Sequence, residues 1–166
     1  GKTTLCEAML FCAGAIDRMG RTDDGTTVTD FDEAEKARKS SVYLSCACLN
    51  WKGVKINLLD LPGFYDFEGE RSEGLQAAGG ALLVVGAGGN VPVGAESVID
   101  YCLKMKKPLI IFINGMDKEN ADYAGTVAAL REKYPGKLAP IPLPIMENGK
   151  MQGRSEERRV GKECRS

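Results

Sequence analysis

Apolar positions along the chain recur with two spacings, and these spacings predict an alternation of helices and strands. Leu5, Met9 and Cys12 stand three to four residues apart, which predicts a helix over residues 1–15. Wholly apolar runs at residues 81–85 and 109–113 are typical of central strands that helices cover on both faces. The pattern therefore predicts buried strands separated by helices.

Further elements fill the intervals between these runs. Residues 42–51 and 54–60 form two predicted strands joined at Lys52-Gly53, a hairpin signal. Alternating strands and helices predict an α/β fold built on a doubly wound sheet, with its ligand at the carboxyl ends of the strands. The other predicted helices cover residues 70–78, 95–106 and 121–133, a short helix could form at 31–37, and a further strand could form at 138–143.

The second strand of this hairpin ends in a carboxylate, Asp60, and the chain then turns at Pro62 and Gly63. A carboxylate at the end of a buried strand can hold a Mg²⁺ water, and the glycine N–H can reach a terminal phosphoryl oxygen. By itself, Asp-x-x-Gly also describes a strand that closes in a Pro-Gly turn.

The first four residues, Gly1-Lys2-Thr3-Thr4, form the last part of the phosphate-loop pattern Gly-x-x-x-x-Gly-Lys-[Ser/Thr]. In that loop, backbone N–H groups and the helix dipole hold phosphates, the lysine reaches the terminal phosphates, and the hydroxyl binds Mg²⁺. We therefore expect Gly1, Lys2, Thr3 and Thr4 to contact a nucleotide, with Thr3 as a metal ligand. The half-motif alone occurs by chance at many helix starts.

A long polar stretch, residues 17–41, separates the first helix from the hairpin. It is either a solvated surface loop or a functional loop over whatever Lys2 and Thr3 bind. Ser41 stands just before the next strand and could supply a hydroxyl to Mg²⁺.

A third motif, Asn114-Gly115-Met116-Asp117, follows the apolar run at 109–113. An aspartate there can accept hydrogen bonds from the N1–H and 2-amino groups of guanine, a donor pair that adenine lacks. The purely structural alternative is a turn followed by a helix N-cap. Three weak motifs nevertheless stand in the right order, each where a strand meets a helix or loop. We infer a nucleotide site.

Composition narrows the class of protein. With 166 residues, 43% of them hydrophobic and 27% charged, the chain fits one α/β domain. No apolar run approaches the roughly 20 residues that cross a bilayer, and a net charge of −1 does not predict nucleic-acid binding by bulk charge. Six cysteines without a Cys-x-x-Cys pair, and no histidine, argue against zinc and a disulfide scaffold. Cys46 and Cys48 share one strand face and are expected in the core.

Four segments resemble the GTPase domain of elongation factor G, and above all its elongation-factor-G-like paralogues. They are Gly-Lys-Thr-Thr-Leu (1–5), Asp-Gly-Thr-Thr-Val-Thr-Asp-Phe-Asp (24–32), Trp-Lys-Gly-Val-Lys-Ile-Asn-Leu-Leu-Asp-Leu-Pro-Gly (51–63) and Phe-Ile-Asn-Gly-Met-Asp-Lys-Glu-Asn-Ala-Asp-Tyr (112–123). The likeness covers residues 1 to about 150, and a run of this length is far more specific than any motif in it.

The resemblance implies a P-loop NTPase-type domain of a translational GTPase, with GTP or GDP and Mg²⁺ as cofactors. It implies a cytoplasmic protein that docks on the ribosome, is monomeric in its full-length form, and binds neither DNA nor membranes. By position, Lys2 and Thr3 match the phosphate and metal contacts, Ser41 matches the hydroxyl of the first switch, and Asp60 and Gly63 match the second switch. Asn114 and Asp117 match the guanine contacts.

Four positions depart from the family pattern. Phe64 stands where elongation factors carry the histidine that positions the attacking water, so no catalytic residue is assigned. Gly115 replaces the usual lysine, whose stem packs over the guanine ring, which predicts weaker binding. Leu61 and Gly86 replace a threonine and an aspartate.

These departures leave three hypotheses open. The first is part of a ribosome-associated GTPase that switches conformation on hydrolysis. The second is a degenerate GTP-binding switch that hydrolyses little, because Phe64 cannot orient a water molecule. The third is a small-molecule kinase or P-loop ATPase, which would leave Asn114 and Asp117 unexplained.

Both ends are interpreted as cut. Residues 1–153 are expected to be a partial GTP-binding domain whose first strand is missing, so that little activity is expected from them alone. Residues 154–166 match the conceptual translation of a sequencing adapter and are expected to be non-native. The alternative for this tail is a basic segment that binds an acidic partner.

Overall fold

The computed structural model describes residues 1–21, 26–28, 44–63, 68–141, 144–147 and 150–154. The chain divides into two compact units. The first unit comprises Gly1–Val84 with Gly94–Ile111, and the second comprises Val85–Val93 with Phe112–Ser166.

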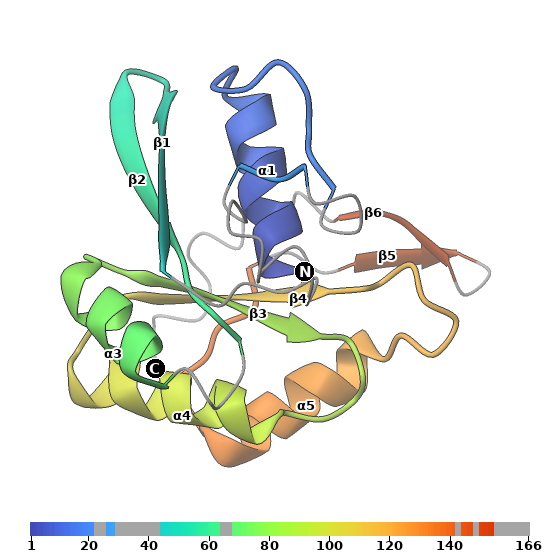
Figure 1. The fold of residues 1–166 in the computed structure, drawn as a ribbon. Helices are drawn as coiled ribbons and strands as arrows, with labels where there is room; N and C mark the ends of the chain where they lie inside the picture. The colour runs from blue at the N-terminus through green and yellow to red at the C-terminus, as the bar shows by residue number, and fades with distance from the viewer. Residues whose placement is uncertain (22–25, 29–43, 64–67, 142–143, 148–149, 155–166) are drawn as a thin grey trace. The chain divides into compact units, whose positions relative to one another are not determined.

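Helix α1 (Lys2–Cys12) opens the first unit and lies alongside the β1–β2 hairpin (Figure 1). Its buried face consists of Thr3, Glu7 and Leu10. The apolar spacing of Leu5, Met9 and Cys12 predicted the helix correctly but not its buried face, since Cys12 is exposed. The helix therefore packs through two polar side chains and one apolar side chain.

The hairpin consists of β1 (Ser45–Trp51) and β2 (Val54–Asp60), as predicted apart from residues 42–43, which lie outside the described part of the chain. The two strands pair antiparallel, with Leu49 opposite Ile56 and Ser45 opposite Asp60. Lys52 and Gly53 both have positive φ, 48° and 81°, as a two-residue type I′ turn requires.

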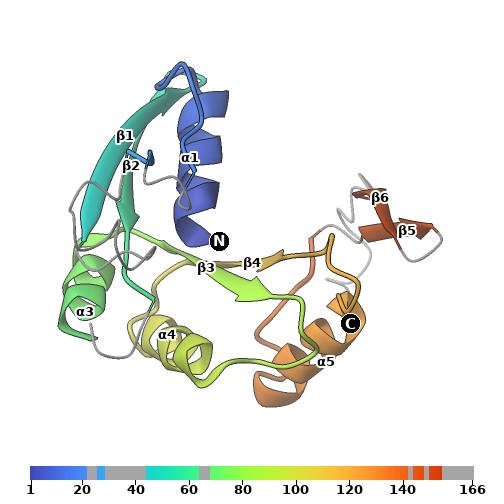
Figure 2. The ribbon, with the colours of Figure 1, turned by 45° about the vertical axis from the view of Figure 1, so that its right-hand side comes forward.

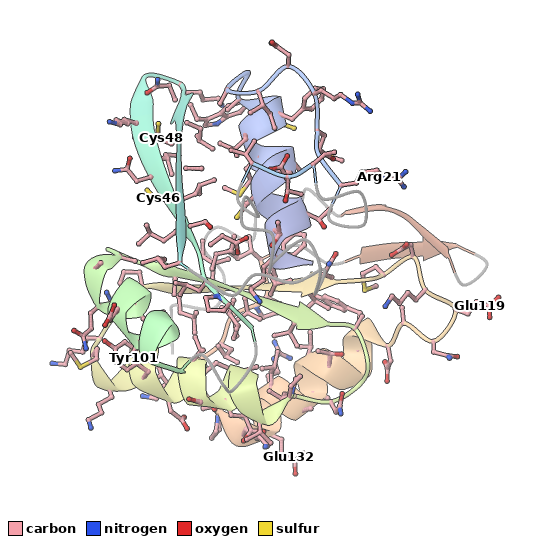
Figure 3. The ribbon with its side chains drawn as sticks, in the orientation of Figure 1. Arg21, Cys46, Cys48, Tyr101, Glu119 and Glu132 are labelled. Carbon is pink, nitrogen blue, oxygen red and sulfur yellow. The ribbon has the colours of Figure 1, made fainter. Side chains whose placement is uncertain are left out.

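The expectation that Cys46 and Cys48 are core residues was wrong. Both thiols are exposed on the same face of β1 (Figure 3), because the opposite face, with the buried Ser45 and Leu49, is the one that turns inward. The alternation of the strand was predicted, but the direction in which each face points was not.

Helices α3 (Glu68–Ala77) and α4 (Val93–Lys104) and strands β3 (Ala81–Gly86) and β4 (Leu109–Asn114) agree with the predicted elements to within two residues at each end. Strands β3 and β4 pair with each other (Figure 2). Ala81 donates to the carbonyl of Pro108, and Ala87 donates to that of Asn114, so the offset is constant and the strands run parallel.

We expected helices to cover both faces of this strand pair, but one face is partly exposed. The side chain of Leu82 in β3 is 43% exposed and that of Ile110 in β4 is 62% exposed. One side of the pair is therefore open to solvent at these two positions.

The second unit contains α5 (Tyr123–Lys133) and a hairpin of β5 (Pro144–Glu147) and β6 (Lys150–Arg154). The predicted strand at residues 138–143 was wrong over residues 138–141, which form no regular element. Pro140, Pro142 and Pro144 recur there, and proline cannot donate to a strand ladder.

The prediction of an α/β fold is confirmed. The described strands pair two by two, as β1 with β2, β3 with β4 and β5 with β6. Within the described ranges, no helix has the length and apolar character that crossing a bilayer requires.

Helices α1 and α4 end in the same motif with different residues at its critical position. At the end of α1, Ala15 donates to Leu10 and Gly14 donates to Phe11, with φ of 68° at Gly14. At the end of α4, Lys107 donates to Cys102 and Lys106 donates to Leu103, with φ of 52° at Lys106. This Schellman motif favours glycine at the residue with positive φ.

We therefore expect Lys106→Gly to raise the free energy of unfolding by about 1 kcal/mol, because a lysine in the left-handed region is strained by about that amount. Urea-induced unfolding measures the change. The control is Lys104→Gly, two residues earlier and still within α4, which should lower stability by about 0.5–1 kcal/mol. Equal effects of the two substitutions would contradict the assignment of strain to Lys106.

Candidate functional site

The centre of the candidate site is a hydrogen bond between two residues that are 57 positions apart in the sequence. The Thr3 hydroxyl donates to Oδ2 of Asp60 over 2.7 Å, and both side chains are buried. Asp60 is only 3% exposed. The structure thus brings together the two described residues that the sequence analysis assigned to Mg²⁺.

Local structure explains why these groups meet. Thr3 lies in the first turn of α1, whose N-cap is Gly1, and Asp60 is the last residue of β2. Beyond Asp60 the strand cannot continue, because Pro62 has no backbone N–H. The side chain of Pro62 is fully buried. The carboxylate therefore stays at the strand end, against the start of the helix.

Lys2 and Gly63 are adjacent in the same unit. A Cβ atom built on Gly63 would collide with Nζ of Lys2. Only a glycine leaves the lysine ammonium this close to the backbone at residue 63. The sequence analysis had assigned both residues to the terminal phosphates, and the structure places them side by side.

The chemistry of these donors suits Mg²⁺. A threonine hydroxyl and a carboxylate are hard oxygen ligands, and Mg²⁺ in nucleotide sites takes one or two such protein ligands together with phosphate oxygens and water. The first turn of α1 carries no acidic residue, so its N–H groups and the positive end of the helix dipole can face an anion. The residues present therefore fit a nucleotide with its metal ion.

The thiol of Cys6 reports the electrostatics of this region. Burial, together with the charges of Asp60 and Glu7, raises the pKa of Cys6 to about 12, while the charge of Lys2 acts in the opposite direction. The thiol is therefore protonated at neutral pH and is a poor nucleophile. Two carboxylates and one ammonium thus act on the same short stretch of α1.

The loop with the predicted guanine contacts lies in the second unit and is held by backbone hydrogen bonds at both ends. Ala87 donates to the carbonyl of Asn114 over 2.9 Å, and its own carbonyl accepts from the N–H of Asp122 over 2.8 Å. Asp117 is exposed and Asn114 is half-buried. The loop is thus fixed at both ends and presents the Asp117 carboxylate to solvent.

Gly115 has a φ of 78°, a conformation that L side chains rarely adopt. A Cβ atom there would lie 3.6 Å from the aliphatic stem of Lys118. Glycine therefore suits the backbone conformation at residue 115. The side chain next to it is that of Lys118.

A hydrogen-bond network around the buried Thr126, beside this loop, was missed by the sequence analysis. Thr126 is fully buried; its hydroxyl donates to the carbonyl of Asp122 over 2.7 Å and accepts from the N–H of Gly89 over 3.0 Å. Asp122 is the N-cap of α5 and accepts from Gly125 over 2.7 Å. The signal that could have found this network is the spacing of Asp122 and Gly125 at a helix start.

The other positions singled out in the sequence lie in several different environments. Gly1 is the N-cap of α1 and Thr4 is exposed on its first turn. Leu61 packs against α3, because a Cβ atom on Gly74 would collide with its side chain, and a Cβ atom on Gly86 would meet nothing within 4 Å. Ser41 and Phe64 lie outside the described residues, as does the short helix considered at 31–37.

The bond between Thr3 and Asp60 can be tested by stability. Thr3→Val keeps the shape of the side chain but removes the donor to a buried carboxylate, so we expect the free energy of unfolding to fall by about 1–3 kcal/mol. Thr4→Val makes the same change at the exposed neighbour and should change stability by less than about 0.5 kcal/mol. Urea titration of both variants measures the difference, and equal losses would contradict a special role for Thr3.

Comparison with known proteins places these features in a family. An elongation factor G-like protein of Mycobacterium tuberculosis is 40% identical over 144 residues, which are 87% of this chain and 20% of the relative. The mitochondrial ribosome-releasing factor 2 of Anopheles gambiae is 35% identical over 153 residues, which are 92% of this chain and 21% of that protein. The chain spans about a fifth of the length of the curated relatives it matches.

A comparison with solved structures agrees with the comparison of sequences. A crystal structure of a protein from Thermus thermophilus matches with a TM-score of 0.86 at 38% sequence identity, over 93% of this chain and 23% of the other chain. The sequence profile of the elongation factor Tu GTP-binding domain matches residues 1–160. The predicted likeness to translational GTPases is thereby confirmed, and the chain belongs to the elongation factor Tu GTP-binding domain family.

Proposed function

We propose that the chain is the nucleotide-binding part of a longer translation factor that binds GTP with Mg²⁺ and switches conformation when the nucleotide is hydrolysed. The observation that carries this proposal is the buried hydrogen bond from Thr3 to Asp60, with Lys2 adjacent to Gly63 in the same unit. These four residues are the ones that the family assigns to the metal ion and the terminal phosphates.

Each residue has a distinct task in this proposal. The Lys2 ammonium neutralises the terminal phosphates, and backbone N–H groups of residues 1–4 hold the phosphate oxygens at the start of α1. Thr3 and Asp60 hold Mg²⁺, together with the Ser41 hydroxyl. The metal ion, when bound, neutralises charge on the phosphate oxygens. The Gly63 N–H senses the terminal phosphate, because loss of that phosphate removes its acceptor.

Recognition of the base falls to Asn114 and Asp117. The exposed carboxylate of Asp117 accepts from the N1–H and 2-amino groups of guanine, and Asn114 supports the loop. Ala87 fixes the backbone at both ends of the loop that carries this carboxylate. A kinase or ATPase has no use for a carboxylate with this role, which disfavours that alternative.

The names of the relatives and the coverage support the rest of the proposal. The relatives are named as elongation factor G-like proteins and ribosome-releasing factors, and the chain spans about a fifth of their length. We infer that residues 1–153 are part of a GTP-binding domain built on a doubly wound sheet. The names support the proposal that the whole protein docks on the ribosome, whereas its monomeric state and its cytoplasmic location remain predictions, since one relative is mitochondrial.

A second candidate function rests on one observation in the sequence. Phe64 replaces the family's histidine, and the chain contains no histidine at all. Phenylalanine can neither orient a water molecule nor accept a proton, so the factor could bind GTP and switch with little hydrolysis. Binding and hydrolysis therefore need separate tests.

The binding test uses Asp117→Asn in the whole protein. An amide offers one acceptor and one donor, which suits xanthine, with its carbonyl at position 2, better than guanine. We expect affinity for GTP to fall about a hundredfold and affinity for XTP to rise, while the wild type prefers GTP to both XTP and ATP. Competition against a fluorescent GDP analogue in the presence of Mg²⁺ measures all three.

Asp122→Asn is the matched control. It makes the same chemical change at the other end of the loop, where asparagine caps a helix as well as aspartate does, so base preference should be unchanged. A wild type that prefers ATP to GTP would remove the GTPase proposal, and an unchanged preference in Asp117→Asn would remove the base assignment.

The hydrolysis test is a single-turnover assay of the whole protein with Phe64 unaltered, with and without ribosomes. A ribosome-docking GTPase should hydrolyse bound GTP many times faster when ribosomes are present. GTP that stays bound and intact on the ribosome would favour the slowly hydrolysing switch. The quantity measured is the rate of phosphate release.

A further inference from the structure

Glu7 is a buried carboxylate on α1 that the proposed nucleotide site does not use. Its side chain is 0% exposed, and both of its oxygens accept backbone hydrogen bonds. Gly20 donates to Oε2 over 2.9 Å, and Val28 donates to Oε1 over 2.6 Å. A buried carboxylate is stable only when its oxygens are paired in this way.

The two donors belong to one loop, whose described ends, residues 20–21 and 26–28, are called the loop stem. The N–H of Arg21 donates to the Thr26 hydroxyl over 3.0 Å, and the N–H of Thr26 donates back to the Arg21 carbonyl over 3.3 Å. A Cβ atom on Gly20 would collide with the backbone of Thr26. The stem is thus closed on itself and attached to α1 by the Glu7 carboxylate.

Glu7 lies close to the nucleotide-binding groups of α1. Glu7 and Thr3 are four residues apart on the buried face of the helix, about 6 Å along its axis. The charges of Glu7 and Asp60 both raise the pKa of the Cys6 thiol, which places both carboxylates near this residue. Since two backbone N–H groups occupy the Glu7 oxygens, the carboxylate positions the chain and is not a further metal ligand.

We propose that Glu7 is a positioning residue that couples the loop stem to nucleotide binding on α1. The inference rests on the proposed function, because the ligand is the nucleotide held by Lys2 and Thr3. The stem cannot leave α1 without breaking two charge-assisted hydrogen bonds to a buried group. Coupling between two sites is reciprocal, so bound nucleotide keeps the stem closed, and an attached stem slows nucleotide release.

The test uses Glu7→Gln in the whole protein. Glutamine keeps the length of the side chain, but its amide nitrogen meets a backbone donor, so one of the two hydrogen bonds is lost. We expect a fluorescent GDP analogue to dissociate about tenfold faster, the effect of one lost hydrogen bond to a charged group. We also expect trypsin to cleave about tenfold faster at two exposed arginines near Gly20, Arg18 and Arg21; Arg21 is labelled in Figure 3.

The control is Glu132→Gln, the same change on the exposed face of α5 (Figure 3), which should leave both rates at the wild-type values. A second variant, Thr26→Ala, weakens the stem without touching the buried carboxylate and should raise both rates about threefold. It decides the question in the same way if Glu7→Gln does not fold.

The outcomes separate this inference from the proposed function. Faster cleavage together with faster GDP release supports the coupling. Faster cleavage with GDP release at the wild-type rate overturns it, because Glu7 then has only a structural role. Unchanged cleavage overturns the anchoring itself. A wild type that binds no guanine nucleotide overturns the proposed function and the coupling together, while the cleavage assay without nucleotide still reports whether Glu7 anchors the stem.

Discussion

The hydrogen bond from Thr3 to Asp60 helps to determine where the candidate phosphate-binding groups of the first unit lie. It joins the start of a helix to the end of a strand, and both partners are buried, so neither side chain can turn to water without a large free-energy cost. Lys2 precedes Thr3, and Gly63 follows Asp60 after the buried Pro62. Once Thr3 and Asp60 are joined, Lys2 and Gly63 are therefore close in space, and the Lys2 ammonium lies next to the Gly63 backbone.

Helix α1 shows why apolar burial alone does not position such a site. Its buried face contains one apolar residue, Leu10, and two polar ones, Thr3 and Glu7. Burial of Leu10 stabilises the packing of the helix but does not fix its orientation, because the hydrophobic effect is non-directional. Each polar group, in contrast, makes hydrogen bonds only along defined directions. Thr3 orients the helix toward β2, and Glu7 attaches the chain that follows the helix. Orientation thus comes from the polar groups, which cannot be satisfied in another register.

The sequence predicted elements and motifs better than it predicted environments. Strands β2, β3 and β4 were predicted because short apolar runs are local signals, and Thr3 and Asp60 were selected as candidates because their motifs are short and ordered. Cys46 and Cys48 were misplaced because alternation shows which residues share a face but not which face turns inward. Glu7 was missed because a carboxylate in a helix usually faces solvent. The signal was present: Glu7 is the one charged residue between Lys2 and Asp17.

The two parts of the candidate site depend on different kinds of interaction. Around Thr3 and Asp60 the geometry is made by two side chains, so a substitution of either residue removes the hydrogen bond that joins α1 to β2. Around Asn114 the loop is held by backbone hydrogen bonds of Ala87, which any residue except proline could supply, and the side chains proposed to meet the base are those of Asn114 and Asp117. A frame of this kind tolerates a changed residue within the loop. Gly115, with its φ of 78°, can therefore stand where the family has a lysine without disturbing the fixed ends, and in the proposed site it changes the surface offered to the base.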